Sequence, residues 1–212
     1  MRYKKFGTWL MTGGLLLIAA ALLLAGYNLW DERRADSYAA DTLAEVRAVI
    51  PDPEPPAETA DPSEAVIPDY ILDPGRDMPA TEVDGEAYIG TLKIPKLYLE
   101  LPVMEDWSYP RLRKAPCRYR GSAYQEDLII AAHNYRCHFG SLKELRPGDE
   151  VLFTDMDGNV FRYAVAETEI LGGGDVEAME SGDWALTLFT CTIGGKTRVT
   201  VRCVPAEPSS PQ

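Results

Sequence analysis

The chain has 212 residues, of which 46% are hydrophobic and 25% are charged, as in ordinary globular proteins, so wholesale disorder is excluded. Its 33 acidic and 21 basic side chains give a net charge of −12. Nucleic acid is therefore not expected as a partner, because phosphate binding needs a basic face. Four cysteines are too few for a domain held together by disulfides. These averages conceal a strong asymmetry between the N-terminal third and the rest of the chain.

The N-terminal segment has the length and composition of a membrane span. Residues 6–30 carry no charged side chain, and about 20 apolar residues suffice to cross the hydrocarbon core. Aromatic residues flank the segment as interfacial belts do: Phe6, Trp9, Tyr27 and Trp30. Three bases precede the span, whereas acids accompany the bases that follow it. The positive-inside rule thus predicts a cytoplasmic N-terminus (1–5) and a single-pass protein of the cell membrane, with the remainder extracellular.

Two other interpretations of this segment compete with a membrane anchor. A cleaved signal peptide is the more serious, since Leu24-Ala25-Gly26 resembles a cleavage site, but the apolar run exceeds the usual 7–15-residue core of such peptides. A buried helix of a soluble protein is disfavoured, because a helix that is apolar all round needs a large core around it. An uncleaved anchor is therefore predicted.

The next two segments differ from the span and from each other. Residues 31–50 lack proline and glycine and place Leu43, Val46 and Ile50 at helical spacing, which predicts a juxtamembrane helical stalk. Residues 51–80 hold eight prolines and eight acids against one base, a composition typical of a semi-rigid, self-repelling linker.

From residue 81 the sequence is that of a mainly β domain, predicted over 81–205 and followed by a flexible tail over 206–212. Short β-rich runs alternate with turn residues, and regular spacing of this kind predicts a closed barrel or a sandwich. The predicted strands are Tyr88–Ile94, Leu99–Met104, Leu128–Ala132, Glu150–Thr154, Val160–Ala166, Ala185–Cys191 and Arg198–Val204.

The acidic run Asp155-Met156-Asp157-Gly158-Asn159 has two interpretations. Asp155, Asp157 and Asn159 have the spacing of the first ligands of a calcium-binding EF-hand loop, but Val160 replaces the required glycine and Ala166 the required glutamate. The segment also lies between strands, and Asp-Gly is typical of a hairpin tip. A hairpin turn is therefore predicted.

Two residues are candidates for a chemical role. His133 follows an apolar strand, on a loop that a rigid element positions, where catalytic groups are common. Cys191 ends another strand, and Lys196 and Arg198 nearby would favour its nucleophilic thiolate form. The alternatives are a surface or capping histidine and a buried structural cysteine.

The run Thr187-Leu188-Phe189-Thr190-Cys191, followed seven residues later by Arg198 at the start of a strand, resembles the active-site signature of sortases, the cysteine transpeptidases of Gram-positive bacterial surfaces. An apolar strand ending in His133-Asn134 fits the same family, although Ala132 stands where many members have glycine. Other matching segments are Ile89–Leu97, Leu101–Val103, Phe139–Leu142 and Gly148–Val151. The resemblance implies a closed sortase-type β-barrel of about eight strands with short helices.

The sequence features that distinguish sortase subclasses do not agree on one subclass. The residues around His133 and Phe139–Leu142 favour class B, whereas the compact domain favours class D or a related group. Asp73-Pro74-Gly75 lacks the aromatic residue of the lid found in pilus-building members.

The resemblance also implies a mechanism. Cys191 would attack the threonine carbonyl of an LPxTG-like sorting signal on a secreted protein and form a thioester, His133 would protonate the leaving amine, and Arg198 would stabilise the oxyanion. An amine from a lipid-linked cell-wall precursor or a pilin lysine would then resolve the thioester, without metal or organic cofactor. The residues expected to contact the substrate are Thr190, Asn134 and Thr187.

Three other functions stay open at this point. An anchored cysteine protease would differ only in using water to resolve the thioester, and a non-catalytic extracytoplasmic binding domain would not acylate. A structural metal site would draw on His133, Cys137, His138 and Cys117, although their spacing matches no standard zinc pattern. Cys117, Cys137 and Cys203 also allow three alternative disulfide pairings.

Overall fold

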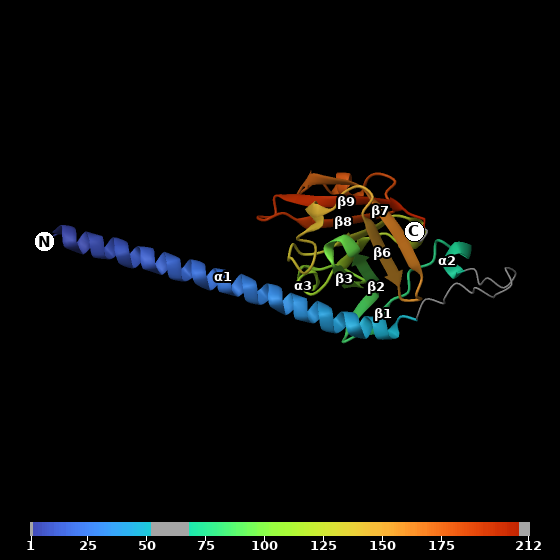
Figure 1. Cartoon of the computed structure of the whole chain (residues 1–212), viewed down its shortest axis with the longest axis horizontal. Helices are drawn as coiled ribbons and strands as arrows, with labels where there is room; N and C mark the ends of the chain where they lie inside the picture. The colour runs from blue at the N-terminus through green and yellow to red at the C-terminus, as the bar shows by residue number, and fades with distance from the viewer. Residues whose placement is uncertain (1, 52–67, 208–212) are drawn as a thin grey trace.

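The computed structural model describes residues 2–51 and 68–207 and joins two parts, a long N-terminal helix and a β-barrel (Figure 1). In the described residues, nine strands form one sheet in the order β1-β2-β3-β4-β5-β8-β9-β7-β6. The sheet closes because β6 also pairs with β2, so β2 to β9 make an eight-strand barrel and β1 extends β2 outside the closure. The predicted closed barrel is confirmed.

The strands are β1 Thr81–Val83, β2 Glu86–Ile94, β3 Leu99–Met104, β4 Cys117–Arg120, β5 Leu128–Ala131, β6 Glu150–Asp155, β7 Val160–Gly172, β8 Leu186–Cys191 and β9 Thr197–Pro205. The helices are short apart from the first: α1 Arg2–Val49, α2 Asp69–Leu72, α3 Tyr109–Leu112, α4 Val176–Glu180, and the 3-10 turns η2 Pro95–Leu97, η3 Ala123–Gln125 and η4 Leu142–Glu144. All seven predicted strands are present. The strands β1 and β4 were not predicted, and β7 extends six residues beyond its predicted end.

Barrel closure depends on a glycine in β2. Gly90 is the first β2 residue to pair with β6, and it has a φ of +148°. A Cβ atom at this position would lie 1.9 Å from the carbonyl oxygen of Thr154, so no larger residue fits without moving the backbone. The barrel interior beside it is filled by apolar side chains from most strands, including Leu92, Ile130 and Leu188.

The hairpin predicted at Asp155–Asn159 is confirmed, because β6 and β7 pair antiparallel on either side of it. The Asp155 carboxylate is buried and accepts hydrogen bonds from the backbone nitrogens of Asp157 and Asn159, at 3.0 and 2.9 Å, and from the Tyr124 hydroxyl at 2.7 Å. Its oxygens therefore stabilise the turn, as the hairpin interpretation requires.

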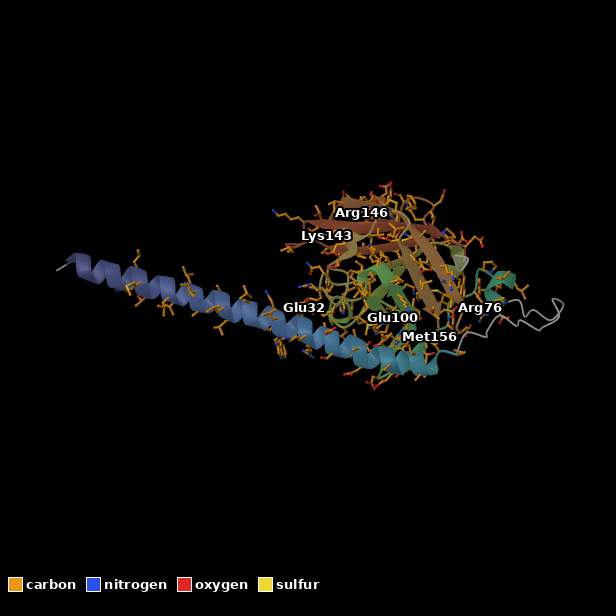
Figure 2. All side chains as sticks on the ribbon, in the orientation of Figure 1. Glu32, Arg76, Glu100, Lys143, Arg146 and Met156 are labelled. Carbon is orange, nitrogen blue, oxygen red and sulfur yellow. The ribbon has the colours of Figure 1, made fainter. Side chains whose placement is uncertain are left out.

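One continuous helix covers both the apolar segment and the predicted stalk. The helix has the length and hydropathy of a membrane span, and its apolar window is not buried in the protein. Its second half packs on the barrel through a stripe of small residues: Ala35, Ala39, Thr42 and Val46. The ion pair between Arg47 and Glu100 fixes the far end of this contact, and Figure 2 shows Glu100 where α1 passes the barrel.

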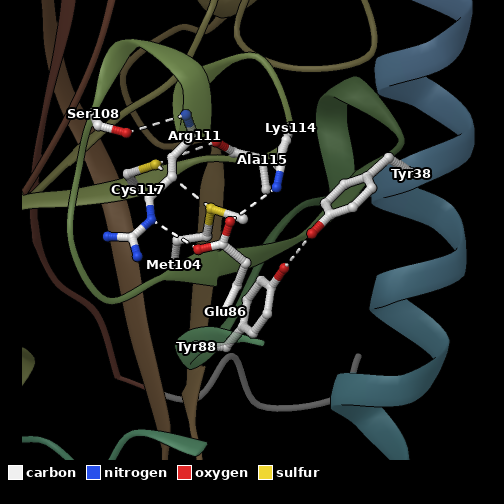
Figure 3. Close-up of polar contacts among 9 residues, drawn as sticks. All are labelled: Tyr38, Glu86, Tyr88, Met104, Ser108, Arg111, Lys114, Ala115 and Cys117. Carbon is white, nitrogen blue, oxygen red and sulfur yellow. Dashed lines mark hydrogen bonds and ion pairs between the residues drawn. The ribbon is translucent and has the colours of Figure 1, made fainter. Parts of the chain in front are cut away.

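A tyrosine pair holds the middle of the same contact. The hydroxyl oxygens of Tyr38 on α1 and Tyr88 on β2 lie 3.0 Å apart, as Figure 3 shows. The stalk is thus a packed element of the fold rather than a free spacer. Most of the predicted linker, residues 52–67, and residues 208–212 of the predicted tail lie outside the described residues.

Candidate active site

Strand pairing places the predicted histidine and cysteine at the same end of two neighbouring strands. Strand β5 runs parallel to β8 in constant register, with Ala131 opposite Phe189. The pairing continues past the end of β5, because the backbone nitrogen of Ala132 donates to the Phe189 carbonyl at 3.2 Å. Extended by one more residue, this register would place His133 level with Cys191.

Arg198 lies on the other neighbouring strand, β9. It pairs directly with Cys191 in the antiparallel β8–β9 ladder, and the order β5-β8-β9 places Cys191 between the other two residues. Neighbouring strands lie about 4.8 Å apart, so Cys191 and Arg198 are close together, and His133 follows the end of the strand on the other side of Cys191. Cys191 is exposed at the end of β8, and the Arg198 guanidinium lies 5.6 Å from the centre of the Phe189 ring.

Two polar atoms of this group lack partners. Nδ1 of His133 and Nε of Arg198 are buried, and neither has a hydrogen-bond partner in the part of the chain that the structure describes. Buried polar atoms are nearly always bonded, and an exception often marks a functional group. Both atoms belong to residues near the strand end that carries the exposed thiol of Cys191, so they indicate a site that a ligand completes.

The helix α1 contacts the loop that carries His133. The Tyr135 ring stacks on the His133 ring, with centroids 3.9 Å apart, and the Tyr135 hydroxyl donates to the carboxylate of Asp31. Next to it, the Glu32 carboxylate accepts from the backbone nitrogen of Arg136 at 2.9 Å; Figure 2 labels Glu32 at this junction. These contacts were not predicted from the sequence. The one feature that could have suggested them is the position of Tyr135, two residues after His133.

Opposing charges surround the His133 ring. Burial lowers the pKa of His133, the positive charge of Arg113 lowers it further, and the Asp31 carboxylate opposes both. Tyr135 and His138 are further titratable groups near the ring. Below its usual value near 6.5, this pKa leaves His133 mostly neutral at pH 7.

The three residues predicted to contact substrate have different surroundings. Asn134 is half-buried and directly follows His133. The Thr190 hydroxyl is buried and donates to the Ala132 carbonyl at 2.8 Å, which fixes the end of β5 to β8. The Thr187 hydroxyl is also buried and accepts from Arg202 at 3.0 Å. Substrate contact by these side chains stays a prediction, and for the two threonines the structure provides internal partners.

Replacing Thr187 with valine separates these two roles. Valine keeps the shape but removes one hydrogen bond to the buried guanidinium of Arg202, so we expect a loss of about 1–2 kcal/mol in stability. The KM for peptide substrate should not change. Thermal unfolding and initial-rate kinetics of the full chain measure the two effects, and a raised KM without loss of stability would instead assign Thr187 to the substrate.

The other three cysteines are poor nucleophiles. Burial raises the pKa of Cys117, Cys137 and Cys203 to about 12 each. All four cysteines are free thiols in this structure. No group of three or more histidine, cysteine or acidic side chains suited to a metal ion occurs among the described residues. Cys191 therefore differs from the other three cysteines in having an exposed thiol.

An exposed cysteine between a histidine and an arginine, at the end of a barrel strand, is the arrangement of a cysteine-dependent acyl-transfer enzyme. The sequence model of the Sortase domain matches residues 92–206. This chain belongs to the sortase family, and it is a sortase-type cysteine transpeptidase. A curated relative, Sortase D of Bacillus subtilis (strain 168), is 26% identical over 182 residues, covering 84% of this chain and 86% of the relative.

Solved structures share the fold. Sortase C1 from Streptococcus agalactiae matches with a TM-score of 0.53 and 22% identity, covering 69% of this chain and 80% of the other. Sortase C from Clostridium perfringens SM101 matches with a TM-score of 0.51 and 21% identity, covering 68% and 78%. A Clostridium perfringens sortase D5 transpeptidase matches with a TM-score of 0.50 and 22% identity, covering 57% and 79%. These likenesses support the barrel fold.

Proposed function

We propose that this transpeptidase is anchored in the cell membrane by residues 6–30 of α1 and cleaves LPxTG-like sorting signals of secreted proteins, with the catalytic domain outside the cell. The observation that carries the proposal is the pairing of Cys191 with Arg198 at the end of a strand of a sortase domain, with His133 just beyond the end of the neighbouring strand β5. An apolar helix with an unburied span supports the anchoring.

The acylation step assigns one role to each of these three residues. The Cys191 thiolate attacks the threonine carbonyl carbon, a carbon–sulfur bond forms, and the peptide carbon–nitrogen bond breaks. His133, as imidazolium, gives its proton to the departing amine. Arg198 donates hydrogen bonds to the oxyanion or to the substrate backbone, and its Nε has no other partner among the described residues.

The second step returns the enzyme to its starting state. An incoming amine attacks the thioester, a new carbon–nitrogen bond forms, and the carbon–sulfur bond breaks. The amine gives a proton back to His133, and Cys191 leaves as a thiolate. A cell-wall precursor or a pilin lysine would supply this amine, whereas water in its place would make the enzyme a protease. A membrane anchor favours the amine, because it raises the local concentration of the enzyme near lipid-linked acceptors.

Product analysis with a peptide panel tests this function. Full-length protein in detergent is incubated with LPxTG-like peptides, with and without triglycine as the amine. We expect cleavage after threonine and a ligated peptide that forms at the expense of the hydrolysed one as triglycine increases. Cleavage products that stay purely hydrolytic at all triglycine concentrations would favour the protease, and absence of cleavage with every peptide would contradict the proposed substrate class.

The charges around His133 predict that two substitutions shift its pKa in opposite directions. Asp31→Asn removes a charge that raises the pKa of His133, so this pKa and the limb of the pH–rate profile that reports it should move to lower pH. Arg113→Gln removes a charge that lowers it, so the same limb should move to higher pH. Histidine-ring NMR titration measures the pKa directly, because the chain has only two histidines.

Asp41→Asn is the matched control, since Asp41 is an exposed acid on the same helix with no role in the loop contact. It should leave the profile in place. Shifts of the same sign in Asp31→Asn and Arg113→Gln would show that neither side chain acts on His133 through its charge.

A further inference from the structure

A cavity lies where the apolar part of α1 gives way to the part that packs on the barrel. The cavity has a volume of about 630 Å³ and lies between one face of α1 and the α3 region; we call it the junction cavity. Its lining includes Tyr27 and Arg34 from the helix and Tyr109, Arg113 and Lys114 from α3 and the turn that follows it. Figure 1 shows α3 at the end of the barrel nearer to the N-terminal half of α1.

Position along the helix places this cavity at the level of a membrane surface. Tyr27 and Trp30 end the apolar segment, where interfacial aromatic residues are expected. Arg34 follows within about one helical turn, and the Trp30 ring lies 5.7 Å from its guanidinium. An object in the junction cavity would thus be at the depth of lipid headgroups.

The cations of the cavity differ in how well they are neutralised. Lys114 is held by Glu86, whose carboxylate also binds Arg111, each contact being 2.8 Å long; Figure 3 shows this cluster. Arg34 and Arg113 are exposed, and no carboxylate lies within ion-pair distance of either among the described side chains. The acid of the cavity, Asp31, is occupied by the Tyr135 hydroxyl.

Two guanidiniums free of carboxylates, lining one cavity together with tyrosine side chains, match the chemistry of a phosphate diester. Arginine donors bind phosphate oxygens in pairs, and positive charges near a bilayer attract anionic lipid. From this geometry we infer that the junction cavity binds the phosphate of an anionic phospholipid headgroup at the membrane surface. The inference rests on the proposed anchoring of α1.

A lipid phosphate bound in the junction cavity would change the charge near the candidate active site. Arg113 lines the cavity and also faces His133, so a bound phosphate would offset part of the positive charge that disfavours the imidazolium. The lipid would therefore both orient the barrel on the membrane and favour the protonated form of the general acid.

Native mass spectrometry of the full chain in neutral detergent micelles tests the site. Phosphatidylglycerol is added against phosphatidylcholine, and the fraction of protein that retains a lipid is measured. We expect preferential retention of phosphatidylglycerol, reduced about tenfold in Arg34→Gln and in Arg113→Gln, because each removes a charge-assisted pair of hydrogen bonds to the phosphate.

Arg33→Gln is the matched control. Arg33 has the same charge and nearly the same depth, but it lies about 100° away around the helix and does not line the cavity. It should retain the lipid as the unchanged protein does. Equal losses in Arg33→Gln and Arg34→Gln would show a general attraction to basic residues, and equal retention of both lipids would show no phosphate site; either result overturns the inference.

A second arm separates the sources of phosphate. Inorganic phosphate at millimolar concentration should not displace the retained lipid, and full displacement would identify a site for free phosphate. Failure of the proposed function is seen separately, since lipid retention needs no peptide, and failure of anchoring appears as protein that does not float with neutral vesicles.

Discussion

Cys191→Ala is expected to abolish both peptide cleavage and ligation, lowering the rate by about 10⁴-fold or more, because no other group in the site can form the thioester. The residue is exposed, so its loss should leave the unfolding temperature nearly unchanged. Cleavage kinetics and thermal unfolding of the full chain measure the two effects.

Cys137→Ala is the control for this substitution. Cys137 lies four residues after His133 and is half-buried, but burial raises the pKa of its thiol to about 12, so little thiolate exists at neutral pH. We expect nearly full activity. An inactive Cys137→Ala variant with an active Cys191→Ala variant would reverse the assignment of the nucleophile.

His133→Gln is expected to lower kcat by about 10²–10⁴-fold with little change in KM, since the leaving amine would lose its proton donor. A peptide substrate whose leaving group is an activated ester should recover most of the acylation rate, because such a group leaves without a proton. Single-turnover acylation of the two substrates measures the difference.

The chain supplies a matched control in its other histidine. His138 is fully buried, and burial lowers its pKa to about 4, so it is neutral at the pH of the assay. His138→Gln should lower the unfolding temperature and keep kcat within about threefold, because a buried neutral histidine makes no proton transfer. Equal losses of kcat in both variants, without rescue by the ester, would contradict a general-acid role for His133.

Much of the fold could be predicted because the barrel strands carry strong local signals. The run from Leu128 to Ala132 is apolar and ends at a turn, and β3 was predicted with its observed bounds, Leu99–Met104. The strand β1 is a three-residue pair outside the closure, and β4 reads Cys-Arg-Tyr-Arg, so neither carries an apolar alternation long enough to predict. The extension of β7 mixes polar and apolar residues without a regular alternation and is paired with β9 along its length.

The candidate catalytic residues could be predicted individually but not as an arrangement. The motif before Cys191 and the apolar strand before His133 were visible in the sequence, whereas their placement at the same end of neighbouring strands comes from parallel pairing between residues 58 positions apart. The contact of Asp31 with Tyr135 joins residues 104 positions apart, and no periodicity in either segment predicts it. The buried stripe of α1 consists of small residues, so it resembles an alanine-rich stalk in the sequence.

The central claim is that Cys191 carries an acyl group that passes to an amine. Its most direct test is intact-mass analysis of full-length protein with the best LPxTG-like peptide, followed by proteolysis to locate the adduct and by addition of triglycine. We expect an adduct equal to the acyl part of the peptide on Cys191 alone, and its conversion to ligated peptide when triglycine is added. An adduct on another cysteine, or one on Cys191 that only water removes, would contradict the account.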